Sequence, residues 1–560
     1  MKNAVIIISQ HDIPAAEEIA KTLEEFEVYV FDPLLVDKIK GSTLPEAKLF
    51  IWENCLEFPA LEKWCHSFAH KMETELDQTV REIIPEVSIR SWQHLNFYYL
   101  LAAVRWYTGL WDEVLGMIPR TKVHVFMCDN PAHYYWPSFI PSLMLLQKLK
   151  QHGLEFSAYT YGSRPANTDI VPNLCGTSDS EEILVHLPTC IYDDRYIDDE
   201  LQASGKKVIN LQAKYWDVKI NASKTIGLVT VSNLDSALLE SFRKKIDLFS
   251  ARILEKIKSL LSPFIATQAY NDRQSQFFTD IYESQLITYY LLEGYFKDSK
   301  PSKVIISDHD AGFHGPIYSF AKKHNIPAIL IPHSKISHYV EFDYSNLISL
   351  SHPIQGNRVS YGDGRRVLNF KLAYPENIVS SSTFPLPLRK IGLVLNSLTT
   401  DGIFYTRYAP YLAGIKAINR WCLENDILLT IRCKPGQLIK TILTEETGID
   451  LSVLHDSLNV TMGEFARNCD LCLMYDTPTS AALEFLRNSI PILNPIPEDI
   501  SWIEGTVTNS SVVPRASVGS ILSMLDSFVS DSINLFVFRN SQSCNYLNSF
   551  RYAYPLRHFL

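Results

Sequence analysis

The chain has 560 residues, of which 46% are hydrophobic, and a formal net charge of -10. This length is too great for one ordinary hydrophobic core and predicts two or three domains. Acidic and basic residues are mixed along the chain, which argues against a general affinity for nucleic acid or anionic membranes. The ten cysteines are scattered, so we expect reduced thiols in a cytoplasmic protein rather than a disulfide framework.

No run of about 18 apolar residues occurs, so no membrane-spanning helix is expected. The short apolar run at residues 4–9 is followed at once by polar residues and is interpreted as a buried first strand. The protein is therefore predicted to be cytoplasmic, free or at the inner face of the membrane, with at most peripheral membrane association.

The N-terminal part of the chain alternates between strand and helix patterns. Strands are predicted over residues 6–9, 28–31, 123–128, 156–161, 303–307 and 326–331, and helices over 13–26, 61–84, 87–115, 137–152, 234–261, 268–296 and 312–324. A stretch rich in Pro, Asn, Ser, Asp and Gly at residues 163–184 predicts a loop that subdivides this region. Alternating strands and helices predict parallel sheets.

A second doubly wound α/β domain is predicted after a polar, Pro- and Ser-containing stretch at residues 375–387. Its strands are expected over 390–397, 427–433, 459–461, 471–475 and 491–493, and its helices over 411–424, 437–445, 463–468 and 478–488. The domains are thus 1–385, 386–530, and a C-terminal helical segment, 531–560, that packs back on the N-terminal domain. In open α/β sheets, ligands bind beyond the carboxyl ends of the strands.

The first candidate turn lies between the strand at 303–307 and the following helix. Two carboxylates and two imidazoles fall within seven residues, namely Asp308, His309, Asp310 and His314. An Asp at this position is suited to act as a general base on a hydroxyl group or as a nucleophile. Gly315 is expected to allow close approach of the backbone to a ligand. The simpler alternative is an Asp that only caps the helix.

The next strand ends at His333, which is predicted to point toward the same edge as Asp308 and to donate a hydrogen bond to a phosphate or sugar oxygen. Arg432 and Lys434 end a later buried strand before a Pro-Gly turn. Their cations suit phosphate groups, although charges at a strand end can simply be solvated.

The last candidate is the start of the helix at 478–488. Pro478 is well placed at the first helical position, and the free amides there favour an anion. We expect a phosphate site formed by the residues around this helix start, with a glutamate one turn later that receives ribose hydroxyls: Tyr475, Thr477, Thr479, Ser480 and Glu484. A plain capped helix is the alternative.

Several other signals are interpreted as structural. Cys469 and Cys472 have no second cysteine pair and are predicted to be core thiols rather than zinc ligands. His66 and His70 have helical spacing but lack the glutamate of a metalloprotease motif. The aromatic residues between positions 92 and 111 suit sugar stacking, but packing is the favoured interpretation. No Walker or dinucleotide fingerprint occurs, which disfavours kinases, ATPases and dehydrogenases.

The C-terminal half resembles the donor domain of bacterial GT-B glycosyltransferases of surface polysaccharide synthesis. The residues that carry this resemblance are the 432–436 turn, the 476–484 helix start and the turn-to-strand segment 488–493. The unit from residue 304 to residue 333 is similar to the last part of their acceptor-side domain. Within the group, the pattern is closest to capsule and lipopolysaccharide transferases, including those that use CMP-activated Kdo.

The resemblance implies a GT-B-like fold, with two Rossmann-like domains facing a cleft and an additional N-terminal α/β region. It implies donor binding by Arg432, Lys434 and the 477–480 helix start, with Asp308 or Asp310 as the catalytic carboxylate and His333 beside it. It also implies a CMP- or UDP-sugar donor, a saccharide or lipid-linked glycan acceptor, and no metal or other cofactor. The family's usual His-Gly pair is His333-Ser334 here, and inverting and retaining chemistry both remain open.

Two other classes of function remain open at this point. A nucleotide-sugar epimerase or hydrolase of the same architecture would use the acid and base groups between Asp308 and His314. A non-catalytic scaffold of a polysaccharide assembly complex would bind a donor without turnover.

Overall fold

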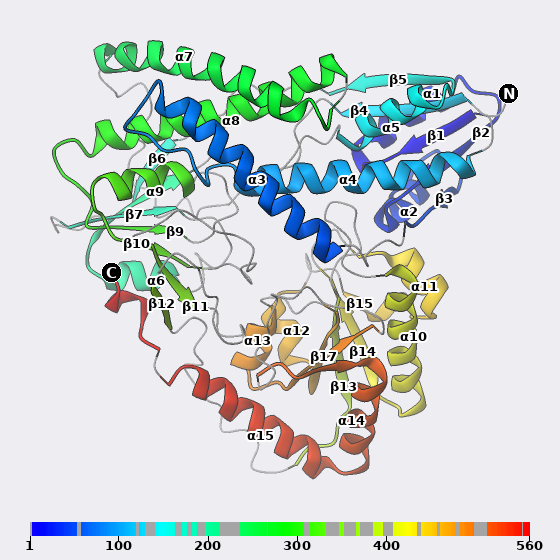
Figure 1. Ribbon diagram of the computed structural model, residues 1–560. Coiled ribbons are helices and arrows are strands. Elements are labelled where there is room, and N and C mark those ends of the chain that lie inside the picture. Colours follow the sequence, from blue (N-terminus) through cyan, green and yellow to red (C-terminus); the bar gives the residue numbers. More distant parts are fainter. Residues whose placement is uncertain are drawn as a thin grey trace.

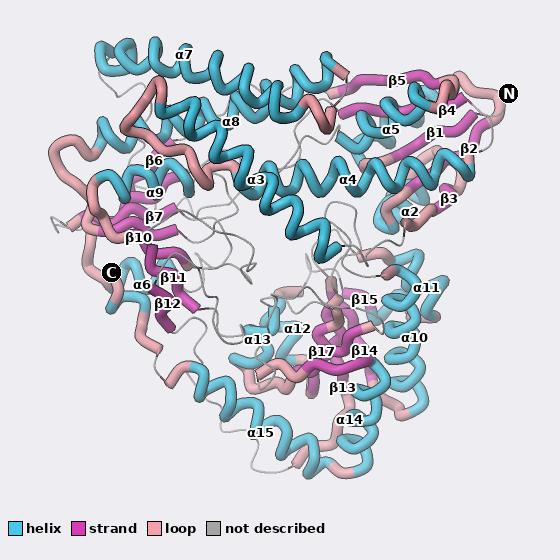
Figure 2. Tube along the Cα trace, in the orientation of Figure 1, coloured by secondary structure: helices cyan, strands magenta, loops and turns pink. Residues whose placement is uncertain are grey.

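The computed structural model describes most of the chain. The described residues are 3–52, 58–118, 122–128, 140–162, 171–175, 182–187, 197–212, 236–265, 267–306, 314–331, 347–351, 366–369, 385–395, 407–433, 438–455, 460–476, 481–497, 512–551 and 553–560. Within them, the strands form three sheets of five, seven and six strands. Figure 2 shows these sheets as separate groups of strands.

The five-stranded sheet is parallel throughout and has the order β3-β2-β1-β4-β5. Its strands are β1 Asn3–Ile7, β2 Phe26–Val30, β3 Ala47–Leu49, β4 Lys122–Cys128 and β5 Phe156–Tyr161. The connecting helices are α1 Ile13–Ala20, α2 Pro33–Lys40, α3 Phe58–Arg81, α4 His94–Met117 and α5 Ile140–Gln151.

The seven-stranded sheet has the order β12-β11-β10-β9-β7-β8-β6, and only β6 is antiparallel to its neighbour. Its strands are β6 Val171–Cys175, β7 Ile183–Leu187, β8 Lys207–Gln212, β9 Lys303–Ile306, β10 Ala328–Leu330, β11 Leu347–Ser351 and β12 Arg366–Asn369. The helices of this part are α6 Asp198–Ala203, α7 Ser236–Leu261, α8 Gln268–Tyr295 and α9 His314–Lys323.

The six-stranded sheet is parallel and has the order β15-β14-β13-β16-β17-β18. Its strands are β13 Lys390–Val394, β14 Leu428–Arg432, β15 Leu454–His455, β16 Leu471–Met474, β17 Ile492–Ile496 and β18 Arg515–Ser517. The helices are α10 Tyr408–Glu424, α11 Lys440–Thr447, α12 Met462–Arg467, α13 Ala481–Arg487, α14 Val518–Ser530 and α15 Ser532–Ser549.

The predicted α/β fold class is confirmed. The seven- and six-stranded sheets are the cores of two Rossmann-like units, and the five-stranded sheet is the additional N-terminal α/β region. The six-stranded sheet has the doubly wound order in which the first strand lies at the centre and the later strands continue on its other side.

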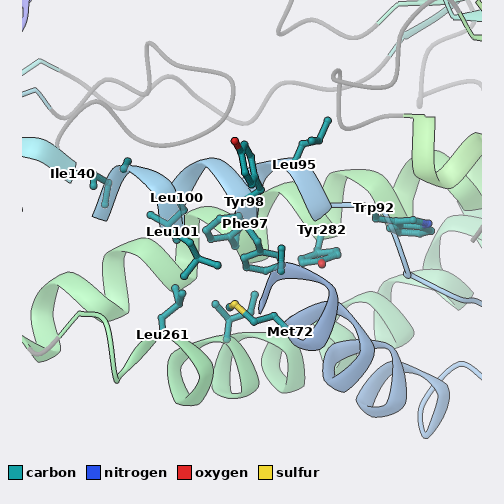
Figure 3. Close-up of a cluster of buried hydrophobic side chains, with 14 of the residues drawn as sticks. Met72, Trp92, Leu95, Phe97, Tyr98, Leu100, Leu101, Ile140, Leu261 and Tyr282 are labelled. Atoms are coloured by element: carbon teal, nitrogen blue, oxygen red, sulfur yellow. The ribbon is translucent and has the colours of Figure 1, made fainter. Parts of the chain in front are cut away.

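The long helices α3, α4, α7 and α8 pack into one apolar layer beside the sheets (Figure 1). Figure 3 shows part of its core around Phe97 of α4. The ring of Phe97 stacks on that of Phe278 of α8, with 4.4 Å between the ring centroids. Trp92, Trp106 and Trp111 are at most 5% exposed. Packing, rather than sugar stacking, therefore accounts for these aromatic residues, as the sequence favoured.

Carboxylates inside this layer hold the turn that leads into α4. Glu73 of α3 accepts hydrogen bonds from the backbone N–H groups of Ser91 (3.0 Å) and Gln93 (2.8 Å). Asp77, one turn later, accepts from the N–H of Ile89 at 2.8 Å. Buried carboxylates are costly unless they are hydrogen-bonded, and here they satisfy backbone donors that the turn leaves unpaired.

The C-terminal residues extend from the six-stranded sheet to the seven-stranded sheet. Gln542 of α15 bonds to both backbone groups of Ile492 in β17. Further on, the N–H of Arg557 donates to Glu200 of α6 (2.9 Å), and Lys206 donates to the carbonyl of Leu560 (2.7 Å). The end of the chain accordingly lies beside α6 in Figure 1.

Several predicted elements are corrected by the structure. The stretch at 163–184, predicted as a loop, contains β6 at Val171–Cys175 and the start of β7 at Ile183. The expected strand at 459–461 does not exist as such: β15 lies earlier, at Leu454–His455, and Thr461 caps α12. The expected helix at 13–26 ends at Ala20, and Phe26 begins β2.

In the parts of the chain described above, no one helix combines the length and apolar character needed to cross a bilayer. Helices α14 and α15 meet that test only when taken together, across a bend of 118°.

Candidate functional site

The strand order of the six-stranded sheet indicates by topology where a ligand would bind. The chain winds outward from β13 through β14 to β15 and then returns to the other side of β13 at β16. The carboxyl ends of β13 and β16 thus flank the point at which the order reverses, which is where doubly wound sheets bind ligands.

Arg432 is the last residue of β14 and lies beside this reversal point. It pairs with Val394 of β13 in the sheet register and is 5% exposed. Its Nη1 donates to the carbonyl of Val460, and its guanidinium carbon lies 5.9 Å from the ring centroid of Phe465. Arg432 therefore places a buried cation at the predicted strand end and ties β14 to the start of α12.

The start of α12 adds polar groups to the same edge. Thr461 and Glu464 cap each other's backbone amides in a reciprocal capping box. The hydrogen bonds from Thr461 hold the pKa of Glu464 below its usual value, and the nearby charge of Arg432 acts in the same direction. The edge thus combines a cation with a helix start.

Glu484 lies in the first turn of α13, against the first turn of α12. A Cβ atom on Gly463 would lie 3.7 Å from Glu484 Oε2 and 3.5 Å from Arg467 Nη1. The structure therefore brings two of the predicted donor residues, Arg432 and Glu484, to the start of α12.

Tyr475 has a different role from the one predicted. Its side chain is fully buried, its hydroxyl donates to the carbonyl of Tyr411 at 2.8 Å, and burial raises its pKa. A Cβ atom on Gly414 would lie 2.1 Å from this hydroxyl, so the helix approaches the ring as closely as a glycine permits. The side chain of Tyr475 is a packing group between β16 and α10.

Asp476 is the residue at this edge that the sequence analysis did not single out. It lies two positions after the last residue of β16, has a left-handed φ of 65° and is 3% exposed. Its N–H donates to the carbonyl of Pro495 at 2.9 Å, and its carbonyl accepts from Asn494 Nδ2 at 2.7 Å. The sequence signal for Asp476 was its position directly after the strand predicted at 471–475. The helix-start role was instead assigned to Thr477, the next residue.

Arg515 of β18 brings a second cation near Asp476. It is the register partner of Asn494. Burial lowers the pKa of Arg515, and the charge of Asp476 opposes that shift. A buried aspartate and a partly buried arginine thus lie together at the carboxyl edge.

In the seven-stranded sheet, the equivalent reversal point lies between β7 and β9, and β9 is the strand that precedes the candidate turn in the sequence. Asp308, His309, Asp310 and His333 fall outside the described residues. His314 begins α9, is 3% exposed, and has its ring 6.3 Å from that of Tyr318. The structure therefore locates the start of the helix that follows this turn.

Gly315 corrects one expectation about this turn. A Cβ atom at Gly315 would lie 2.4 Å from Cδ1 of Trp92, so the glycine allows close packing of α9 on Trp92 rather than approach to a ligand. Trp92 Nε1 donates to Ser319 Oγ at 2.9 Å, and Ser319 donates to the carbonyl of Ser88 at the same distance. The turn before α4 thereby fixes the start of α9.

The remaining predicted donor residues, Lys434, Thr477, Thr479 and Ser480, also fall outside the described residues. Cys469 and Cys472 are buried free thiols whose pKa values are raised by burial, which confirms the core interpretation. His66 Nδ1 lies 2.9 Å from His94 Nε2, and burial lowers the pKa of His66 to about 2. Among the described residues, no group of three or more His, Cys, Asp or Glu side chains could hold a metal ion.

Comparison with known proteins gives only distant similarity. No family model and no curated protein sequence matches the chain. Among solved structures, the glycosyltransferase SnogD from Streptomyces nogalater aligns at 12% identity and a TM-score of 0.37, covering 68% of this chain and 96% of its own. The lipopolysaccharide outer core galactosyltransferase WaaB, in its apo form, aligns at 11% identity and a TM-score of 0.28, covering 48% and 79%.

A UDP-N-acetylglucosamine 2-epimerase also aligns, at 12% identity and a TM-score of 0.32, covering 66% of this chain and 93% of its own. TM-scores this low carry no argument about function. The functional conclusion therefore depends on the chain's own residues.

Proposed function

We propose that the chain is a glycosyltransferase that takes a sugar from a CMP- or UDP-sugar bound at the carboxyl edge of the six-stranded sheet. The acceptor would be a saccharide or lipid-linked glycan of bacterial surface-polysaccharide synthesis. The observation that supports this most directly is the position of Arg432, a buried cation at the end of β14 beside the reversal of the strand order.

The donor's phosphates are the natural partners of this cation. An arginine has five N–H donors, so it can bond to the Val460 carbonyl and to a phosphate oxygen at once, and its fork matches phosphate geometry. In this proposal Lys434 and the helix start at Thr477, Thr479 and Ser480 complete the phosphate site, and Glu484 accepts from the ribose hydroxyls. The phosphate charge is then met by cations and helix amides, without a bound metal.

The acceptor hydroxyl would be activated from the seven-stranded sheet. In the proposal Asp308 or Asp310 takes its proton, or attacks the anomeric carbon. His333 donates a hydrogen bond to a phosphate or sugar oxygen, and His309 and His314 contact the sugars. The position of His314 at the start of α9, the helix that follows β9 beside the reversal between β7 and β9, supports this arrangement.

A thermal-shift screen with CMP, UDP, GDP and their sugars tests the donor site. Binding stabilises the folded protein, by about 2.7 kcal/mol at a ligand concentration one hundred times the Kd, and so raises the melting temperature. We expect a shift with one nucleotide, and we expect Arg432→Ala to abolish it. Arg389→Ala is the matched control, because Arg389 is exposed before β13, at the opposite edge of the sheet.

Absence of a shift with every nucleotide, or an undiminished shift in Arg432→Ala, would reject this donor site. Product analysis of the bound nucleotide sugar without acceptor then separates a transferase from an epimerase, because only the epimerase converts the donor alone.

A further inference from the structure

The end of β16 lies beside a strand that lacks one backbone donor. Strands β16 and β17 are parallel, with Leu473 paired to Leu493, and the same register places Tyr475 opposite Pro495. In a parallel ladder, a residue bonds through its N–H and its carbonyl to the two residues that flank its partner. The carbonyl of Pro495 accepts from the N–H of Asp476, but proline has no N–H to offer the carbonyl of Met474.

The side chain of Asn494 supplies the missing donor. Its Nδ2 donates to the carbonyl of Met474 at 2.5 Å and to the carbonyl of Asp476 at 2.7 Å. The residue is fully buried, and an unpaired carbonyl at this depth would cost about 1–3 kcal/mol. One amide group thus satisfies two backbone acceptors, one inside β16 and one just beyond it.

The two bonds have different consequences. The bond to Met474 completes the ladder between β16 and β17, which concerns the stability of the sheet. The bond to Asp476 holds a residue with a left-handed φ of 65°, a conformation that non-glycine residues seldom adopt. This second bond therefore sets the direction in which the chain leaves β16.

We propose that Asn494 is a positioning residue for the nucleotide site: its bond to the Asp476 carbonyl fixes the turn at the reversal point and so aligns the edge that binds the donor. This inference rests on the proposed function, since it requires a nucleotide at this edge. It predicts that nucleotide affinity depends on the Asp476 bond and not on the Met474 bond.

A pair of substitutions separates the two bonds. Asn494→Ala removes both of them. Adding Pro495→Ala restores a backbone N–H opposite the Met474 carbonyl but does not replace the bond from Asn494 to the Asp476 carbonyl. Pro495→Ala alone is the matched control, because Asn494 keeps both of its bonds in that variant.

The melting temperature and the Kd for the nucleotide that binds the wild type are measured for each protein, the Kd at a temperature at which each is folded. Asn494→Ala is expected to lower the melting temperature and to weaken binding about tenfold. The double variant regains most of the stability but stays weak in binding, and Pro495→Ala binds as the wild type does. A purely structural role would leave the Kd of the folded protein unchanged.

Wild-type affinity in Asn494→Ala, or affinity that returns together with stability in the double variant, overturns the proposal. If Asn494→Ala does not fold, the double variant carries the same comparison: weak binding supports the proposal and wild-type binding overturns it. If the wild type binds none of the nucleotides, the proposed function fails and this role with it, and that result is seen before any variant is measured.

Discussion

The five-stranded and six-stranded sheets have the same topology but use it differently. In both, the first strand lies inside the sheet and the order reverses beside it, between β1 and β4 in one and between β13 and β16 in the other. Topology alone would therefore predict a ligand site at both carboxyl edges. The residues that follow the strands separate the two cases.

At the edge of the five-stranded sheet, the protein's own carboxylate takes the place of a ligand anion. Asp12 Oδ2 accepts from the N–H groups of Ile8 (2.9 Å) and Ser9 (2.8 Å), and Oδ1 accepts from the hydroxyl of Tyr161 (2.6 Å). Pro14, at the start of α1, has no N–H to offer. The donors that a phosphate would use are thus already engaged.

The edge of the six-stranded sheet differs in the side chains near its strand ends. Asn494 bonds to carbonyls rather than to amides, and Arg432 contributes a cation. We therefore expect nucleotide binding at the second edge alone. On this proposal, strand order marks both edges as possible sites and the residues at the strand ends determine which of them binds the nucleotide.

The largest expected effect on the free energy of unfolding comes from the pH dependence of the Asp12 carboxyl. Burial raises the pKa of Asp12 from 3.8 to about 6, against the opposing effect of its hydrogen bonds. The folded-state pKa is higher than the unfolded one, so this contribution to stability is fully present below pH 3.8 and is lost as the pH rises through about 6. The loss amounts to about 3 kcal/mol at 1.36 kcal/mol for each pKa unit.

Urea unfolding of the wild type and of Asp12→Asn over a pH series measures this term. Asparagine keeps the shape of the side chain but does not titrate, so the difference in unfolding free energy between the two proteins should change by most of that amount, about 2.4 kcal/mol, from pH 4 to pH 7. A constant difference over this range would show that Asp12 does not titrate as a buried carboxyl.

A smaller effect is expected from Gly414, which lets α10 approach Tyr475 beside the six-stranded edge. A Cβ atom there would lie 2.1 Å from the Tyr475 hydroxyl, so Gly414→Ala should destabilise the protein by about 2 kcal/mol through overpacking. Gly116 is the matched control, because it also lies within a helix but has no atom within 4 Å of its added Cβ.

Gly116→Ala should instead stabilise the protein by about 0.5–1 kcal/mol, the usual helix preference for alanine. Urea unfolding of both variants is the measurement. Equal stability of the two alanine variants would show that Tyr475 can move away from its packed position at little cost.

The alternation of strands and helices was predictable because periodicity and turn residues are local signals. The strand over 459–461 was wrong because Val460 and Thr461 are β-branched and favour strands. A stronger signal was present: Thr461 followed three residues later by Glu464 is a capping box. The strand propensity of these two residues therefore predicts the wrong element, whereas the capping box predicts the observed helix start.

The end of β17 could not be predicted for a different reason. Pro495 normally ends a central strand, so the strand was expected to end at residue 493. The structure continues β17 to Ile496 because residues 494–496 pair with β18. On the other side, the side chain of Asn494 supplies the donor that Pro495 lacks toward β16. Both interactions involve strands outside the local sequence, β16 and β18.

The candidate site shows the same limit. The sequence correctly predicted that Arg432 ends a buried strand, because a strand end is a local property. It could not show that the side chain of Tyr475 points into the core, since that depends on Tyr411, which lies 64 positions away. Asp476 was missed because its left-handed backbone is imposed by Asn494.

The smallest expected effect on stability comes from the left-handed backbone of Asp476, which has no counterpart in the Asp12 turn. Glycine adopts a positive φ freely, whereas alanine pays about 1–2 kcal/mol there. Both substitutions remove the carboxylate, so the difference between Asp476→Gly and Asp476→Ala isolates the backbone. We expect the glycine variant to be more stable by about 1 kcal/mol in urea unfolding.

Asp426 provides the control for this comparison, because it has a φ of 55° but is exposed at the end of α10, away from the carboxyl edge. Its glycine and alanine variants should differ by a similar amount, with no change in nucleotide affinity. If Asp476→Ala proved as stable as Asp476→Gly, the left-handed turn after β16 would not be held by the sheet, and the six-stranded edge would lose the feature that distinguishes it from the five-stranded one.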